Sequence, residues 1–337
     1  MDWIRNKTIL VTGGTGTIGS ELVRQILTHD PKQVRILSRD DTKQYELLES
    51  LNQPSNVRLL IGDIRDRERL NFALSGVDMV FHAAALKHVP ICEYNPYEAI
   101  NTNVTGSQNL IDAAIRNGVR KVVAISTDKA ANPTNIMGMT KLLMERLFIN
   151  ANYSKGKTDT AFSCVRFGNV TWSRGSVLPL WERQIKEGGK IKITNPKMTR
   201  FFMSKAQAIY LTLKAMELSE GGEIFVFKMP SITLGGLAKI YLQKHHADKK
   251  VRTERTKARA GEKLHEELLG TPNGEIYVHE NKEMLILLPD PNIHHIGKSS
   301  YQANVEERKY PSFRKISTPN ALSSRNKISE KMIRLII

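Results

Sequence analysis

A glycine-rich loop joins an apolar strand to an amphipathic helix near the start of the chain. Residues 7–14 (KTILVTGG) predict a strand that ends on glycine, and residues 16–30 carry apolar side chains at helical spacing. Glycines let the backbone turn tightly and approach a pyrophosphate, while the N–H groups and dipole at the helix N-terminus favour an anion. The loop therefore predicts a dinucleotide site formed by Gly13, Thr15, Gly16, Thr17, Ile18 and Gly19.

Strands and helices continue to alternate through the first half of the chain. Further strands are expected within residues 34–40, 57–66, 77–85, 119–127 and 160–170, with helices between them. This alternation is typical of a parallel sheet with helices on both faces. We predict an α/β fold, a Rossmann-type doubly wound parallel sheet with a smaller α/β C-terminal substrate lobe.

Three parts are expected along the chain. Residues 1–172 form the dinucleotide-binding domain, and residues 173–290 form the substrate lobe, which is partly interleaved with the first domain. Residues 291–337 form a basic C-terminal tail, in which residues 329–337 predict a helix.

The charge balance restricts the classes of partner. The 337 residues carry 50 Lys+Arg against 34 Asp+Glu, a net charge of +16. Such an excess suits nucleic acid, an acidic membrane surface or a phosphorylated small ligand. No nucleic-acid-binding motif accompanies it, so we expect a phosphorylated ligand and no nucleic acid. The apolar run at residues 284–289 is too short to span a bilayer, so no membrane insertion is expected.

The N-terminus and the cysteines predict the compartment. The opening residues MDWIRN mix both charges and lead directly into a strand, which is unlike a signal peptide. Cys92 and Cys164 match no metal-binding spacing, so we expect no metal site. Two unpaired thiols also predict a reducing, cytoplasmic location.

The end of the second strand predicts the choice of dinucleotide. An acidic residue there would bind both ribose hydroxyls of NAD, but Ser38 and Arg39 occupy the place. Both can donate hydrogen bonds to a 2′-phosphate, with Lys43 as an addition, so we predict NADP. Asp40, one position further on, keeps NAD as the alternative. The remaining expected cofactor contacts are Asp63, Ile64, Ala83, Ala84, Ala85, Lys87 and Asn103, together with Lys141.

Residues 122–148 predict a strand, a polar loop and a helix. Thr127, Asp128 and Lys129 end the strand, and Met137 and Lys141 share one face of the helix at i,i+4. This segment resembles that of short-chain dehydrogenases and reductases, which carry Tyr-x-x-x-Lys at the same spacing. Their tyrosine exchanges a proton with the substrate hydroxyl. Here methionine replaces tyrosine, so redox chemistry is expected but the proton must move another way; filling the core is the alternative role for Met137.

Eleven motifs together resemble the extended short-chain dehydrogenases, in particular the UDP-N-acetylglucosamine 4,6-dehydratases of the CapD-like polysaccharide-biosynthesis group. They are GGTGTIG, SRDD, GDIRD, HAAALKHVP, NTNVTGS, STDKAANPTN, MGMTK, RFGNV, GSVLP, MTRFFMS and GEKLHEELL. The chain looks like the short type, without the N-terminal membrane region of the large members and with the methionine variant. The resemblance implies a hydro-lyase with tightly bound NADP or NAD, UDP-GlcNAc as substrate, and a homo-oligomer.

The resemblance also implies the order of the chemistry. Oxidation of C4 to a ketone makes the C5 proton acidic, the C5 proton and the C6 hydroxyl are lost as water, and hydride returns to C6. We expect Thr127 to bond the C4 oxygen, and Asp128 to take the C4 hydroxyl proton and protonate the leaving C6 hydroxyl. Lys129 would abstract the C5 proton, which requires a pKa lowered by desolvation and by a nearby positive charge such as Lys141. Lys141 itself would mainly anchor the ribose. The alternative for Asp128 and Lys129 is a solvated loop pair.

Contacts to the substrate are expected from the fourth strand onward. The expected set is Lys87 and His88 at the sugar, Arg166 and Asn169 facing the site from the end of the sixth strand, Ser176 and Val177 against the nucleotide, Thr199 and Arg200 with the arginine for a phosphate, Arg259 at the diphosphate, and Glu262 on a ribose hydroxyl. For Asn169 the resemblance implies a contact to the diphosphate. Surface salt bridges are the alternative for the charged members. We expect retention of configuration at C5, with inversion as the alternative. Two other functions stay open, another UDP-sugar epimerase or reductase and a non-catalytic NADP-binding regulatory protein.

Overall fold

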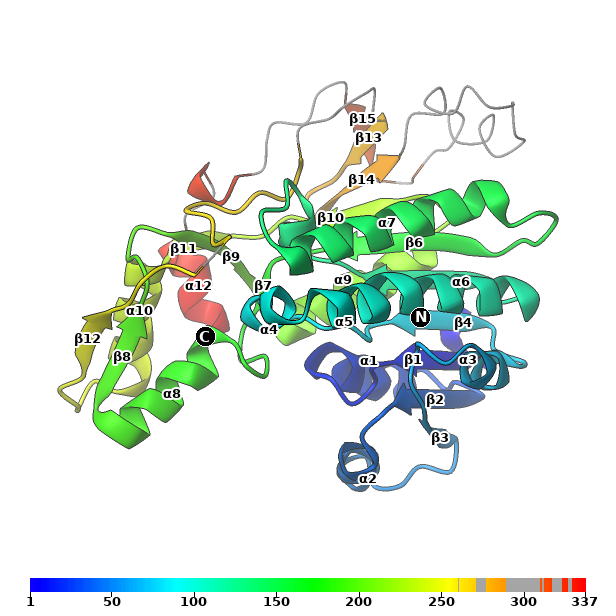
Figure 1. Ribbon diagram of the computed structural model, residues 1–337, viewed down its shortest axis with the longest axis horizontal. Coiled ribbons are helices and arrows are strands. Elements are labelled where there is room, and N and C mark those ends of the chain that lie inside the picture. Colours follow the sequence, from blue (N-terminus) through cyan, green and yellow to red (C-terminus); the bar gives the residue numbers. More distant parts are fainter. Residues whose placement is uncertain (260, 271–276, 289–309, 311, 317–322, 327–328) are drawn as a thin grey trace.

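A ten-stranded sheet forms the centre of the computed structural model (Figure 1), in the order β15-β13-β14-β10-β6-β5-β4-β1-β2-β3. The structure describes residues 1–337 except 260, 271–276, 289–309, 311, 317–322 and 327–328. The strands are β1 (Thr8–Thr12), β2 (Gln33–Ser38), β3 (Val57–Ile61), β4 (Met79–His82), β5 (Lys121–Ile125), β6 (Ala161–Arg166), β10 (Ile224–Phe227), β13 (Tyr277–Glu280), β14 (Met284–Leu288) and β15 (Arg314–Ile316). Every pairing from β3 to β10 is parallel, and β14, β13 and β15 add antiparallel strands at the far edge.

Helices cover the sheet in two groups. They are α1 (Thr17–Leu27), α2 (Asp41–Ser50), α3 (Arg67–Leu74), α4 (Val89–Tyr94), α5 (Pro96–Ile100), α6 (Gly106–Arg116), α7 (Ile136–Ser154) and α9 (Lys205–Leu218). Helix α6 packs between α3 and α7, and α1 packs against α9. All five residues of β1 are buried, as a central strand covered on both faces requires. The predicted doubly wound parallel sheet is confirmed.

A second, smaller lobe has its own core, at the left of Figure 1. It contains β7 (Asn169–Val170), α8 (Val177–Gly188), β8 (Lys190–Ile193), β9 (Thr199–Met203), β11 (Ser231–Thr233), α10 (Leu234–His245), β12 (Arg252–Arg255) and α12 (Glu330–Ile336). Trp181 and Tyr241 are fully buried at its centre. The chain enters this lobe, returns to the large sheet through α9 and β10 and re-enters through β11, so the two parts are interleaved.

The end of the chain packs into this lobe. Helix α12 lies on α10, and Ile333 and Ile337 are buried in the lobe's core. The helix expected at residues 329–337 is therefore present, and β15 adds an edge strand to the large sheet. Within the described residues, no helix combines the length and the apolar character needed to cross a bilayer.

Candidate active site

A cavity of about 960 Å³ extends from the carboxyl ends of β1, β2 and β4 to the second lobe. Most of the residues expected from the sequence line it. They are Gly13, Thr15, Gly16, Thr17, Ile18, Gly19, Ser38, Arg39, Lys43, Asp63, Ile64, Ala83, Ala84, Ala85, Lys87, His88, Thr127, Lys129, Met137, Lys141, Asn169, Ser176, Val177, Arg200, Arg259 and Glu262. The fold thus brings the two halves of the expected site together around one cavity.

The glycine-rich loop at one end of the cavity is closely packed. Gly13 has φ +64°, and a Cβ there would lie 2.7 Å from the Cα of Ala84. A Cβ on Gly19 would lie 2.3 Å from the carbonyl oxygen of Gly13. Helix α1 begins at Thr17, so its first N–H groups face the cavity. This cradle fits a dinucleotide pyrophosphate.

Donors gather where the adenosine ribose would lie. Ser38, Arg39 and Lys43 line the cavity. Asp40 lines the cavity as well, and its Oδ1 accepts a hydrogen bond from the backbone N–H of Lys43 at 2.9 Å and caps α2. Its other oxygen is ion-paired with the Lys43 ammonium, and these contacts lower the pKa of Asp40.

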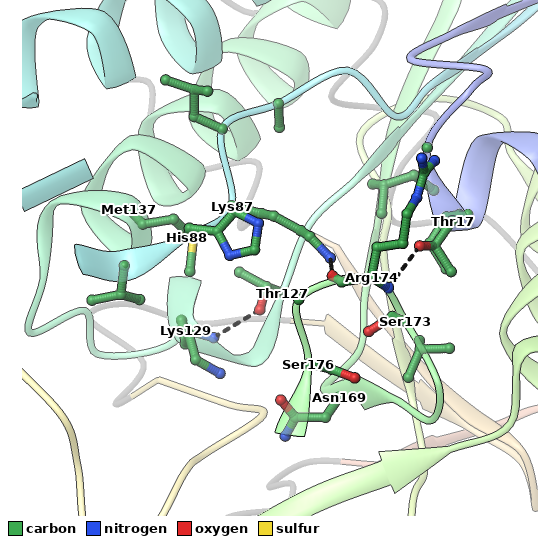
Figure 2. Close-up of a pocket in the computed structure, with 18 of the residues that line it drawn as sticks. Thr17, Lys87, His88, Thr127, Lys129, Met137, Asn169, Ser173, Arg174 and Ser176 are labelled. Carbon is green, nitrogen blue, oxygen red and sulfur yellow. Dashed lines mark hydrogen bonds between the residues drawn. The ribbon is translucent and has the colours of Figure 1, made fainter. Parts of the chain in front are cut away.

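Thr127 and Lys129 meet on one side of the cavity (Figure 2). Both bond to Oδ1 of Asp128, the Thr127 hydroxyl at 2.8 Å and the Lys129 ammonium at 3.0 Å. Asp128 itself is fully buried and does not line the cavity. Its Oδ2 has no hydrogen-bond partner and lies behind Gly168, where a Cβ would come within 3.0 Å of it. Asp128 is therefore connected to the cavity through its hydrogen bonds with Thr127 and Lys129.

The electrostatics of Lys129 differ from the sequence expectation. Burial alone would lower the pKa of its ammonium, but the carboxylates of Asp128 and Glu266 outweigh burial and raise it. Lys129 Nζ lies 3.6 Å from Glu266 Oε1. The expected lowering of the Lys129 pKa is thus wrong for this state, because two carboxylates face the ammonium. Lys141, which was expected to repel it, is not among the groups that shift its pKa.

Met137 and Lys141 do share one face of α7, as their spacing predicts. Both line the cavity and both are buried. Met137 packs against Cys92 and Ala99. Lys141 Nζ donates a hydrogen bond to the carbonyl of Ile125 at 2.8 Å. Burial lowers the pKa of Lys141 to about 8.

A loop from the second half of the chain is bonded to the glycine-rich loop. The backbone N–H of Arg174 donates to Thr17 Oγ1 at 3.1 Å, and its guanidinium donates to the carbonyl of Thr15. Lys87 reaches across the cavity and donates to the carbonyl of Arg174 at 2.8 Å (Figure 2). His88 lies against Gly175, where a Cβ would come within 2.4 Å of its ring. The sequence offered no signal for Arg174, since the contact joins segments far apart in the chain.

Three residues with expected ligand contacts lie away from the cavity. Arg166 is buried, and its Nη2 lies 2.5 Å from Glu145 Oε2 while its Nη1 donates to the carbonyl of Leu268 at 2.9 Å. Asn103 is also buried and exchanges hydrogen bonds with both backbone groups of Leu86.

Thr199 is the third of these residues. Its hydroxyl bonds to His265 Nδ1 at 2.8 Å and to Ser324 Oγ at 2.6 Å. The side chains of Arg166, Asn103 and Thr199 thus all make hydrogen bonds within the protein. These three residues lie behind the cavity lining and do not form part of it. Apolar lengths of strand and helix predict where an element lies but not which polar partner it meets.

A sequence profile of the family described as "Polysaccharide biosynthesis protein" matches residues 9–287. A Methanocaldococcus jannaschii protein, named an uncharacterized membrane protein, is 50% identical over 86% of this chain and 87% of its own. A Campylobacter jejuni UDP-N-acetylglucosamine 4,6-dehydratase (inverting) is 45% identical over 82% of this chain and 81% of its own. A Rickettsia canadensis UDP-glucose 4-epimerase is 45% identical over 79% of this chain and 78% of its own. The solved structure of Pen from Bacillus thuringiensis superposes with a TM-score of 0.88 at 41% identity, covering 98% of this chain and 96% of that one.

Proposed function

The chain belongs to the polysaccharide biosynthesis protein family, and from this premise we propose that it is a UDP-N-acetylglucosamine 4,6-dehydratase that holds NADP tightly. The product is a UDP-4-keto-6-deoxy-N-acetylhexosamine. The observation that carries the proposal is the bonded group Thr127, Asp128 and Lys129, which opens onto the cavity beside Met137. Elimination of water needs an acid and a base beside the sugar, and this group supplies both kinds of side chain. The identity of 45% to a named dehydratase supports the same activity.

The dinucleotide end of the cavity fits NADP. The loop from Gly13 to Gly19 would hold the pyrophosphate, and Ser38, Arg39 and Lys43 would hold the 2′-phosphate. Asp40, the residue that favours NAD, is already engaged as the cap of α2. When bound, the nicotinamide accepts a hydride from C4 and returns it to C6. Lys141, which lines the cavity, would bond the nicotinamide ribose.

Thr127 supplies the route for the C4 hydroxyl proton in place of a tyrosine. Its hydroxyl lines the cavity and already donates to the buried Asp128 carboxylate. As C4 is oxidised, the Thr127 oxygen takes the substrate proton and passes its own proton to Asp128. The proton passes along the 2.8 Å hydrogen bond that already joins the Thr127 hydroxyl to Oδ1 of Asp128.

Lys129 and Asp128 then complete the elimination. The neutral amine of Lys129 takes the C5 proton, and the protonated Asp128 returns its proton through the Thr127 hydroxyl to the departing C6 hydroxyl, which leaves as water. The atoms balance, since the proton from O4 leaves in the water and the proton from C5 stays on Lys129. Lys129 afterwards returns a proton to C5 when C6 is reduced.

Two products differ in configuration at C5. The methionine variant led us to expect retention, in which the proton returns to the face it left. The Campylobacter relative is named inverting, and this favours inversion as the second candidate. The residues that line the cavity are compatible with retention and with inversion, so they do not decide between the two products.

An epimerase is the remaining candidate among enzymes, favoured by the name of the Rickettsia relative. An epimerase returns hydride to C4 and leaves C6 untouched. A non-catalytic NADP-binding protein would leave the sugar unchanged. The fate of C6 therefore separates the dehydratase from the other two, and the configuration at C4 separates the epimerase from the non-catalytic protein.

The proposal includes a homo-oligomer in the cytoplasm. Large apolar side chains are exposed on α4, α5 and α7, which contact one another, and this supports a self-association surface. They are Ile91, Tyr94, Tyr97, Ile100, Met139 and Leu143. Cys92 and Cys164 are free and buried, which suits a reducing compartment.

The test is an NMR time course with UDP-GlcNAc and catalytic NADP in D₂O. A new C6 methyl signal with deuterium at C5 supports the dehydratase, and the ring couplings of the product assign the C5 configuration. A C4 epimer with an intact C6 hydroxyl would support the epimerase. An unchanged sugar with intact cofactor binding would contradict both enzymes.

A further inference from the structure

Glu266 lies beside the catalytic group, on a segment that sequence patterns did not connect to it. Its backbone is fixed from both sides, because its N–H donates to Ser324 Oγ at 2.8 Å and its carbonyl accepts from the N–H of Ser324 at 2.8 Å. The neighbouring Leu264 carbonyl accepts from the N–H of Thr199 at 3.0 Å. The segment is therefore held against β9 and the end of the chain, with the Glu266 side chain in the cavity wall.

The Glu266 carboxylate is nearly inaccessible and only half engaged. Its side chain is 4% exposed. Oε1 lies 3.6 Å from Lys129 Nζ and 3.8 Å from Arg200 Nε, while Oε2 has no hydrogen-bond partner. A buried charge without full hydrogen bonding is costly, so such a group at a cavity wall indicates a function.

Arg200 does not account for this carboxylate. Its Nη1 donates to the carbonyl of Thr199 at 2.8 Å, and its Nη2 donates to the carbonyl of Lys263 at 2.9 Å. The same Nη2 approaches Glu262 Oε1 at 3.4 Å. The guanidinium is thus bonded elsewhere, and the movable proton nearest to Glu266 belongs to Lys129.

Lys129 therefore stands between two carboxylates, Asp128 and Glu266. With both ionised, the lysine keeps its proton and cannot act as a base. Once Asp128 has received the C4 hydroxyl proton through Thr127, its negative charge is gone. Glu266 is then the one ionised carboxylate of the two that faces the Lys129 ammonium. The proton on Lys129 then has a single ionised acceptor beside it.

We propose that Glu266 is a positioning residue that acts through Lys129, receiving the lysine's proton after C4 oxidation and so freeing the amine for the C5 proton. The inference rests on the proposed dehydratase function. In the step an N–H bond of Lys129 breaks and an O–H bond forms on Glu266, which leaves a neutral amine and a neutral carboxylic acid. After product formation the proton returns to Lys129, and no external oxidant or reductant is needed.

The test compares Glu266→Gln with Glu266→Asp and with Glu267→Gln as matched control. Glu267 is the adjacent carboxylate, whose Oε2 accepts from Asn132 at 2.5 Å and which lies away from Lys129. Each protein is assayed for product formation against pH, for UDP-GlcNAc affinity by calorimetry, and for the sugar bound after an acid quench, by mass spectrometry.

The expected result is specific to one step. Glu266→Gln should lower kcat by about 10²- to 10⁴-fold, the range of acid–base contributions, with substrate affinity unchanged. The quenched enzyme should hold a 4-keto sugar that keeps its C6 hydroxyl and its C5 protium, and activity should rise with pH. Glu266→Asp should restore part of the rate, and Glu267→Gln should match the wild type.

Two results would overturn the inference while leaving the dehydratase intact. One is a Glu266→Gln protein with wild-type rate and pH profile. The other is a loss of C4 oxidation in Glu266→Gln and Glu266→Asp alike, which would indicate a structural role. If the wild-type protein itself makes no 4-keto-6-deoxy sugar, the proposed function fails and the inference fails with it.

Discussion

Thr127 Oγ1 donates a hydrogen bond of 2.8 Å to Asp128 Oδ1, and so links the cavity to a carboxylate that is itself fully buried. A tyrosine at position 137 would offer its own proton to the cavity. With methionine there, the Thr127 hydroxyl and the Lys129 ammonium both line the cavity and reach the aspartate, and of the two the hydroxyl can accept a proton while it donates one. In the proposed mechanism the proton route thus runs along the end of β5 and not from a side chain of α7.

Replacing Thr127 by valine tests this route. The isosteric side chain removes the hydroxyl, so the C4 proton loses its path to Asp128 and kcat should fall by about 10²-fold or more. Thr127→Ser keeps the hydroxyl and should retain most of the rate. A Thr127→Val protein with wild-type turnover in the NMR assay would show that the proton leaves by another path.

The proposed preference for NADP rests on the residues at the end of β2. Arg39→Ala removes a donor that suits a 2′-phosphate, so the Kd for NADP should rise by about 10-fold or more while the Kd for NAD stays within twofold. Titration of each dinucleotide with the purified apoprotein measures both values. The control is Arg183→Ala, which removes an exposed arginine of α8. Equal weakening of both dinucleotides would contradict a 2′-phosphate contact.

Patterns of short range predicted much of this molecule. The glycine-rich loop and the i,i+4 relation of Met137 and Lys141 depend on residues a few positions apart, where backbone geometry fixes the relation between side chains. The strand ends of the first half followed from apolar runs, and in a parallel sheet those ends gather at one edge.

Polar partners across the fold were not readable in the same way. Arg166 was expected to face the substrate, but it bonds to Glu145 from α7 and to the Leu268 carbonyl. Glu266 reaches Lys129 only because β9 and Ser324 hold its segment in place. The spacing of residues along the chain does not indicate which buried charged side chains will pair across the fold. The contacts of Arg166 and Glu266 are therefore visible only in the three-dimensional structure.

Lys141 predicts a pH dependence of stability in the apoprotein. Its pKa falls from 10.5 to about 8 on folding, because burial disfavours the charged form. Below pH 8 the folded and unfolded chains both hold the proton, and between pH 8 and 10.5 only the unfolded chain holds it. The contribution of Lys141 to the free energy of unfolding should therefore rise across this window, by about 3 kcal/mol at most for such a shift.

Denaturant unfolding at pH 7.5 and pH 10, about the two ends of that window, measures this contribution. Lys141→Met lacks the titrating group, so the difference between wild type and variant should move in favour of the wild type as pH rises. A difference that stays constant between the two pH values would contradict a buried, weakly basic lysine.

Glu145 and Arg166 form a buried ion pair behind Ser126, which lines the cavity. Glu145 is fully buried, and its carboxylate accepts from Ser126 Oγ at 2.6 Å as well as from the arginine. Arg166→Met would leave this carboxylate without a cation and should lower the free energy of unfolding by about 3–5 kcal/mol. The double variant Glu145→Met, Arg166→Met removes both charges and should lose less than the single variant. Denaturant titrations of the wild type, Glu145→Met, Arg166→Met and the double variant give the coupling free energy between the two side chains. Additive losses of stability would mean that the two side chains do not stabilise each other.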